Sequence, residues 1–65
     1  MQWTDFLQLQ IREEEHVRAK YEYAASRVRD PELKKVFRQL AYEENTHIAI
    51  IRNFYEKLKE KKKAR

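Results

Sequence analysis

One break divides a chain that otherwise contains almost nothing to interrupt a helix. Its 65 residues include no Gly and a single Pro, Pro31. Proline disfavours helical backbone at the residue before it and suits the first turn of a new helix, whose free N–H groups Asp30 can bind. We therefore predict antiparallel helices at about residues 4–29 and 31–61, joined by a short turn at residue 30.

Each predicted helix carries one apolar arc. A two-helix hairpin has no third layer to cover these arcs, so a stable form requires association. The simplest closure is a symmetric homodimer, in which residues 1–65 form a half-domain and two hairpins make an all-α four-helix bundle. The arcs comprise Trp3, Phe6, Leu7, Ile11, Val17, Tyr21, Ala24, Ala25 and Val28, and then Leu33, Phe37, Leu40, Ile48, Ile51, Tyr55 and Leu58.

Polar residues lie where these arcs should be purely apolar. Glu14 is near the centre of the first arc, and Gln10 lies one turn earlier, where we expect a partly buried amide. Glu44 and His47 point within about 60° of each other on the second arc, at roughly 100° per residue. With the turn near residue 30, Glu14 faces the region between Glu44 and His47, so all three should meet near the middle of the hairpin.

In the predicted dimer this group occurs twice and places four carboxylates and two imidazoles in the core. Carboxylates that converge in an apolar core without a counter-charge repel each other and take up protons or admit water. Two divalent cations would neutralise the set, and its oxygen and imidazole ligands suit iron or manganese, with zinc as a further occupant. The absence of Cys excludes Cys-ligated zinc and any iron–sulfur or rubredoxin-type centre on this chain.

Each of these residues also has an interpretation without metal. Glu14 could be an edge carboxylate paired with a neighbouring Arg, and His47 could be a core imidazole that hydrogen-bonds to Glu44. Tyr21, one heptad after Glu14, is either a core aromatic or a phenol that hydrogen-bonds to a ligand carboxylate. The whole chain could then be a non-catalytic helical interaction module, whose buried Glu and His specify register. A third interpretation is a fragment of a longer helical chain.

A second Glu-x-x-His spacing, formed by Glu13 and His16, points away from the first arc. We expect these two residues at the surface, where they could bind a peripheral cation. The outer surface stripe that carries these two residues could also provide a second contact, through which dimers assemble into a higher oligomer.

The order and spacing of three segments resembles the rubrerythrin branch of the ferritin-like superfamily. The segments are Glu14 with Tyr21 and Ala25, then residues 30–37, then residues 40–47, and the likeness covers about residues 10–58. A Glu from each of two helices and Glu-x-x-His from each of the other two is the ligand set of ferritin-like di-metal bundles. The resemblance implies that Glu14, Glu44 and His47 bind two irons per dimer, with Tyr21 close to the site.

The chain length is also similar to that of the encapsulated ferritins, whose hairpin protomer completes a di-iron ferroxidase site at a dimer interface. By that analogy Glu44 bridges the two irons, and Glu14 and His47 are terminal ligands. The activity so implied is oxidation of Fe(II) by O2 or peroxide, in iron storage or oxidative-stress protection, with Glu14, Glu44, His47 and Tyr21 as the catalytic residues. Since the chain carries no Cys-ligated electron donor, ferroxidase activity is favoured over autonomous peroxidase activity.

Charge and hydropathy bear on partners and location. No run of about 18 apolar residues and no signal-peptide pattern is present, so we expect a cytoplasmic protein without a membrane partner. The formal net charge of +4 is concentrated in residues 57–65. No aromatic residues are interleaved with the lysines of this segment. The segment is therefore better explained as a solvated helix end than as a nucleic-acid-binding surface. We recognise no encapsulin-targeting tail in the basic residues 59–65, although an encapsulin shell stays open as a compartment.

Overall fold

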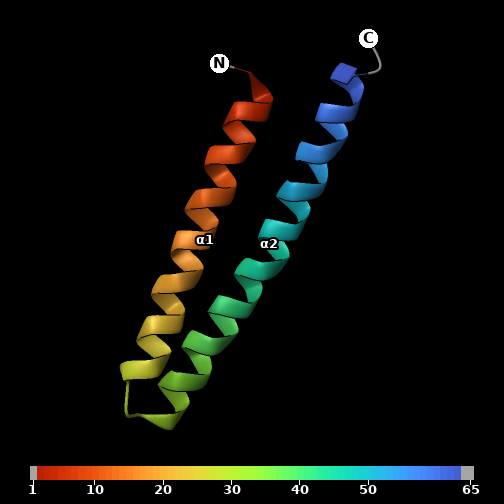
Figure 1. Cartoon of the computed structure of the whole chain (residues 1–65). Helices are drawn as coiled ribbons and strands as arrows, with labels where there is room; N and C mark the ends of the chain where they lie inside the picture. The colour runs from red at the N-terminus through yellow and green to blue at the C-terminus, as the bar shows by residue number, and fades with distance from the viewer. Residues whose placement is uncertain (1, 64–65) are drawn as a thin grey trace.

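The computed structural model describes residues 2–63, which form two helices and no strand. Helix α1 (Trp3–Arg27) and helix α2 (Pro31–Lys63) lie side by side and antiparallel, so that the start of α1 and the end of α2 are at the same end of the hairpin (Figure 1). The Cα atoms extend over 54 × 18 × 11 Å. Two helices side by side form a single layer, with no further element within residues 2–63 to cover either side. The predicted all-α hairpin is therefore confirmed.

The turn is longer than the sequence predicted. Helix α1 ends at Arg27, and Val28 is extended, with φ −72° and ψ 142°. Connections between antiparallel helices that pack against each other commonly have about two to five residues. Residues 28–30 form a connection of this length.

The predicted cap of the second helix is present. Asp30 Oδ1 accepts hydrogen bonds from the backbone N–H groups of Glu32 (2.8 Å) and Leu33 (3.2 Å). The far end of α2 extends to Lys63, slightly beyond the predicted boundary. Residues 64 and 65 of the predicted basic tail lie outside the described residues, as does residue 1.

Contact between the two helices buries very little. Among the described residues, only Ile11, Ala25, Ala41 and Ile48 are buried. By helical periodicity, many of the remaining apolar side chains of both helices share one side of the layer, where Trp3 is 72% exposed and Phe54 is 56% exposed. We call this side the apolar face; it comprises Trp3, Phe6, Val17, Tyr21, Ala24, Leu33, Val36, Leu40, Ile51, Phe54 and Leu58.

The opposite side of the layer is polar and holds the helices together by side-chain contacts. Gln8 Nε2 donates to the Tyr55 hydroxyl at 2.9 Å, near the open end of the hairpin. On the same side, Arg18 Nη1 donates to Asn45 Oδ1 at 2.6 Å and Arg52 Nη2 lies 3.6 Å from Glu15 Oε2. These contacts leave the apolar face as the uncovered side of the hairpin. Neither helix within residues 2–63 is both long and apolar enough to cross a bilayer.

Candidate metal centre

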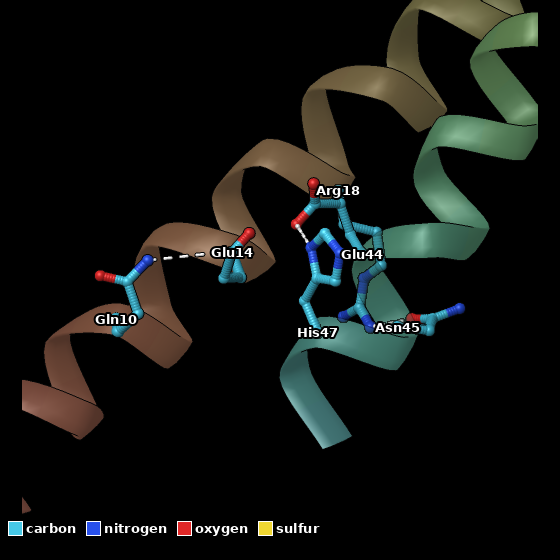
Figure 2. Close-up of polar contacts among 6 residues, drawn as sticks. All are labelled: Gln10, Glu14, Arg18, Glu44, Asn45 and His47. Carbon is cyan, nitrogen blue, oxygen red and sulfur yellow. Dashed lines mark hydrogen bonds and ion pairs between the residues drawn. The ribbon is translucent and has the colours of Figure 1, made fainter. Parts of the chain in front are cut away.

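Three of the predicted site residues come together in the middle of the hairpin. Glu14 projects from α1, whereas Glu44 and His47 project from one turn of α2 (Figure 2). One ligand atom from each of the three lies within 4.8 Å of the other two. The group forms because α2 runs back along α1 from the turn at residues 28–30, which brings the middles of both helices to the same level.

The three side chains differ in their exposure to solvent. The side chain of Glu44 is 13% exposed, that of His47 is 53% exposed, and Glu14 is half-buried. His47 Nδ1 lies 3.6 Å from Glu44 Oε2, which is longer than a hydrogen bond. Within residues 2–63, the buried Glu44 Oε2 has no hydrogen-bond partner. His47 and Glu44 are thus close enough for an ion pair, but the half-exposed His47 ring is not buried in a core in this hairpin.

The two carboxyl groups perturb each other's protonation. The closeness of the Glu14 carboxyl, burial and the negative charge of Glu14 all raise the pKa of Glu44, whereas His47 acts in the opposite direction. The pKa of Glu14 is lowered by the closeness of the Glu44 carboxyl and further by Gln10 and His47, against the effect of burial. One proton between the two carboxyls, held mainly by Glu44, is the arrangement that limits their repulsion.

This donor set fits a divalent cation. Two carboxylates and an imidazole are the oxygen and nitrogen ligands that iron, manganese and zinc accept in proteins. A cation between them would take the place of the shared proton and supply a partner for Glu44 Oε2. Three side chains from one hairpin also leave coordination positions for further ligands.

Tyr21, the fourth predicted site residue, packs against an aromatic ring of the other helix. Its half-buried ring stacks on Phe37, with the centroids 6.3 Å apart and the planes inclined by 25°. Among the side-chain hydrogen bonds of residues 2–63, none joins its hydroxyl to Glu14 or Glu44. The packing favours the core interpretation for this hairpin, and a catalytic role for Tyr21 stays a prediction.

Glu13 and His16 are exposed, as expected for surface residues, and do not belong to the metal-binding group. Arg18, which could have paired with Glu14, instead bonds to Asn45 across the helices. Sequence reasoning missed this contact beside the site. The positions of the two residues could have predicted the contact, because Arg18 lies one turn after Glu14 and Asn45 directly follows Glu44.

A family model described as Rubrerythrin matches residues 5–65. The chain belongs to the rubrerythrin family. The match covers nearly the whole hairpin and includes Glu14, Glu44 and His47, so the family resemblance expected from these residues is confirmed. Rubrerythrin-family domains are ferritin-like and bind iron, and in this member the Glu–Glu–His group could hold a metal. Neither the curated proteins nor the solved structures contain a match to the chain.

Proposed function

We propose that this rubrerythrin-family hairpin acts as a homodimeric di-iron carboxylate protein that oxidises Fe(II) with O2 or peroxide. The observation that carries the proposal is the environment of the Glu44 side chain. Its Oε2 is buried without a hydrogen-bond partner in the described chain, inside a group of three metal-binding side chains. A buried unpaired oxygen is costly, and a bound cation removes that cost. The activity would serve iron storage or protection against oxidative stress.

The homodimer is supported by the apolar face. Its large side chains are too exposed for a lone hairpin, and the described residues bury only Ile11, Ala25, Ala41 and Ile48 between the helices. Exposed apolar surface of this extent marks an interaction site. Glu14 lies near the middle of α1, and Glu44 with His47 near the middle of α2, so a two-fold axis at the site lets two apolar faces overlap along their length.

The symmetry mate would bring a second Glu14, Glu44 and His47 to the same level, which makes four carboxylates and two imidazoles for two metal ions. Iron is the metal we propose, with manganese or zinc as alternative occupants of the same ligands. The exposed stripe that carries Glu13 and His16, on the outside of such a dimer, would offer a second contact for larger oligomers. We propose no nucleic-acid or membrane partner, and the cytoplasm or an encapsulin shell as the location.

The residues of the chain would have distinct tasks in this reaction. Glu44 releases its proton when a cation binds, because a carboxylate must be deprotonated to act as a ligand. His47 would hold the metal through a ring nitrogen. In the proposed dimer the two apolar faces would cover the site and limit access of water. Two Fe(II) ions, bound as substrate, would each lose one electron to the oxidant. If the oxidant is O2, these two electrons and two protons reduce it to H2O2. If the oxidant is H2O2, two electrons and two protons reduce it to two waters.

The proposal is tested by following Fe(II) oxidation by absorbance in the wild-type protein and in the variants Glu44→Gln and His47→Ala. Both substitutions should slow oxidation by about 10-fold or more, because each removes a metal ligand. Glu43→Gln is the matched control, since Glu43 is an exposed neighbour outside the group. Wild-type oxidation at the rate of buffer alone, with no iron retained after loading, would contradict the proposal.

The interaction-module alternative predicts a different result in a second measurement. If the Glu and His side chains serve only to specify register, the melting temperature should be the same with a divalent metal and with chelator. If they bind metal in the folded dimer, metal must raise the melting temperature. Sedimentation of the same samples reports whether the hairpin dimerises.

A further inference from the structure

Gln10 contacts the metal-binding group from one helical turn away. It lies on α1 four residues before Glu14, a spacing that makes two side chains neighbours on a helix. Its Nε2 donates a partly buried hydrogen bond to Glu14 Oε1 at 3.3 Å (Figure 2). Gln10 is itself half-buried on the side of α1 that carries the apolar face.

Glu14 is the ligand that most needs a support of this kind. It is the single member of the group that comes from α1, and it faces the Glu44 carboxyl within 4.8 Å. Repulsion between two carboxylates favours rotation of the half-buried Glu14 side chain toward water. An amide N–H bound to one of its oxygens opposes that rotation.

The chemistry of the donor matters as much as its position. A Lys or Arg at residue 10 would also bind the Glu14 carboxylate, but its fixed positive charge would repel an incoming cation. The amide of Gln10 is neutral, so it orients the carboxylate and leaves the negative charge available to a metal. A hydrogen bond to one oxygen also leaves the second oxygen free as a ligand.

We propose that Gln10 is a positioning residue of the metal centre, whose amide holds one oxygen of Glu14 so that the other stays directed toward Glu44 and His47. The proposal rests on the metal-binding function proposed above. Loss of a hydrogen-bond partner of a metal ligand typically weakens metal binding by about 10–100-fold. Gln10→Leu removes the donor at nearly constant helix propensity and should weaken binding in this range.

The chain contains a matched control. Gln39 Nε2 donates to Glu43 Oε2 at 3.5 Å, with the same spacing of four residues but on the exposed outside of α2. Gln39→Leu therefore removes the same type of contact from a carboxylate that is not part of the metal-binding group. Gln10→Asn provides a second test that keeps the side chain polar, because its shorter amide should not reach Glu14.

The test is titration of the full chain with Co(II), whose visible absorption reports both occupancy and coordination geometry. Gln10→Leu and Gln10→Asn should bind Co(II) about 10–100-fold more weakly than wild type and show an altered absorption band. Gln39→Leu should match wild type in both respects, and circular dichroism without metal should show equal helix content in all four proteins.

Three outcomes overturn the proposal, and they can be told apart. If wild type binds Co(II) and both Gln10 variants bind it within twofold with the same absorption band, Gln10 does not position Glu14 and the metal centre stands. If wild type itself binds no Co(II), the metal centre fails and the role of Gln10 fails with it. A loss of affinity in Gln39→Leu equal to that in Gln10→Leu also overturns the proposal, since the effect would then not depend on Glu14.

Discussion

Replacement of Glu44 by Gln should change stability in opposite directions with and without metal. Without metal, Glu44 faces the Glu14 carboxyl and keeps a buried oxygen that has no hydrogen-bond partner among the described residues. Gln has nearly the same volume and carries no charge, so the variant should be more stable than wild type. With metal the order should reverse, because wild type gains binding free energy and the variant has lost a ligand.

The structure sets the size of both effects. Two ionised carboxylates with oxygens no more than 4.8 Å apart repel each other by about 3.5 kcal/mol or more at an effective dielectric constant of about 20. Because the pKa of Glu44 is raised, proton uptake relieves part of this repulsion, and we expect a gain of about 1 kcal/mol per chain in the metal-free variant. For a domain of this size that gain raises the melting temperature by about 4–8 °C.

Metal should reverse the order by a larger amount. A ligand that binds only the folded state at a concentration about 100 times its Kd adds about 2.7 kcal/mol per site. Wild type should gain stability of this order from excess Zn(II), which serves as a redox-inert probe, and Glu44→Gln should gain little.

The assay is thermal unfolding followed by far-UV circular dichroism, at neutral pH and one fixed protein concentration, with chelator or with excess Zn(II). Glu43→Gln serves as the control that removes one negative charge from the exposed side of α2. The reasoning is refuted if Glu44→Gln melts below wild type in chelator, or if zinc stabilises the variant as much as it stabilises wild type.

Further predictions concern pH, the turn and the apolar face. Above the ordinary carboxyl value of 4.5, the metal-free protein should lose stability as pH rises through the raised pKa of Glu44, because the folded state retains a proton that the unfolded chain has released. Below 4.5 the lowered pKa of Glu14 acts in the opposite sense, so its contribution is lost as pH falls, and melting curves across pH should show both slopes. Asp30→Ala should cost about 1 kcal/mol in denaturant unfolding, since the N-terminus of α2 loses its cap; an unchanged midpoint would contradict this. Leu40→Arg should abolish dimers in sedimentation, whereas Tyr42→Arg, at a site 67% exposed, should leave them intact.

Much of the fold followed from local chemistry that the sequence displays. The lack of Gly, together with the Asp30–Pro31 pair, predicts two helices and the cap that the structure contains. The length of the turn did not follow, because it depends on the distance between the helix axes, which propensity does not encode. Helix α1 therefore ends at Arg27, two residues before the predicted boundary at residue 29.

The candidate site, too, was predicted only in part from the sequence. Helical periodicity was sufficient to predict that Glu14, Glu44 and His47 would converge, because all three are fixed by spacing along regular helices and by distance from the turn. Periodicity alone could not tell which contacts the longer side chains make. Tyr21 and Arg18 both had a plausible role beside the carboxylates, yet Tyr21 stacks on Phe37 and Arg18 bonds to Asn45.

By itself, then, the sequence determined two helices, their antiparallel return and the level at which three metal-binding side chains meet. These properties depend on backbone geometry that repeats with a fixed period. Only the tertiary structure decided that Glu44 Oε2 is buried without a hydrogen-bond partner among the described residues while His47 remains half exposed, and that Gln10 bonds to Glu14. Burial and rotamer choice depend on where the second helix lies, and this is settled only when the two helices pack.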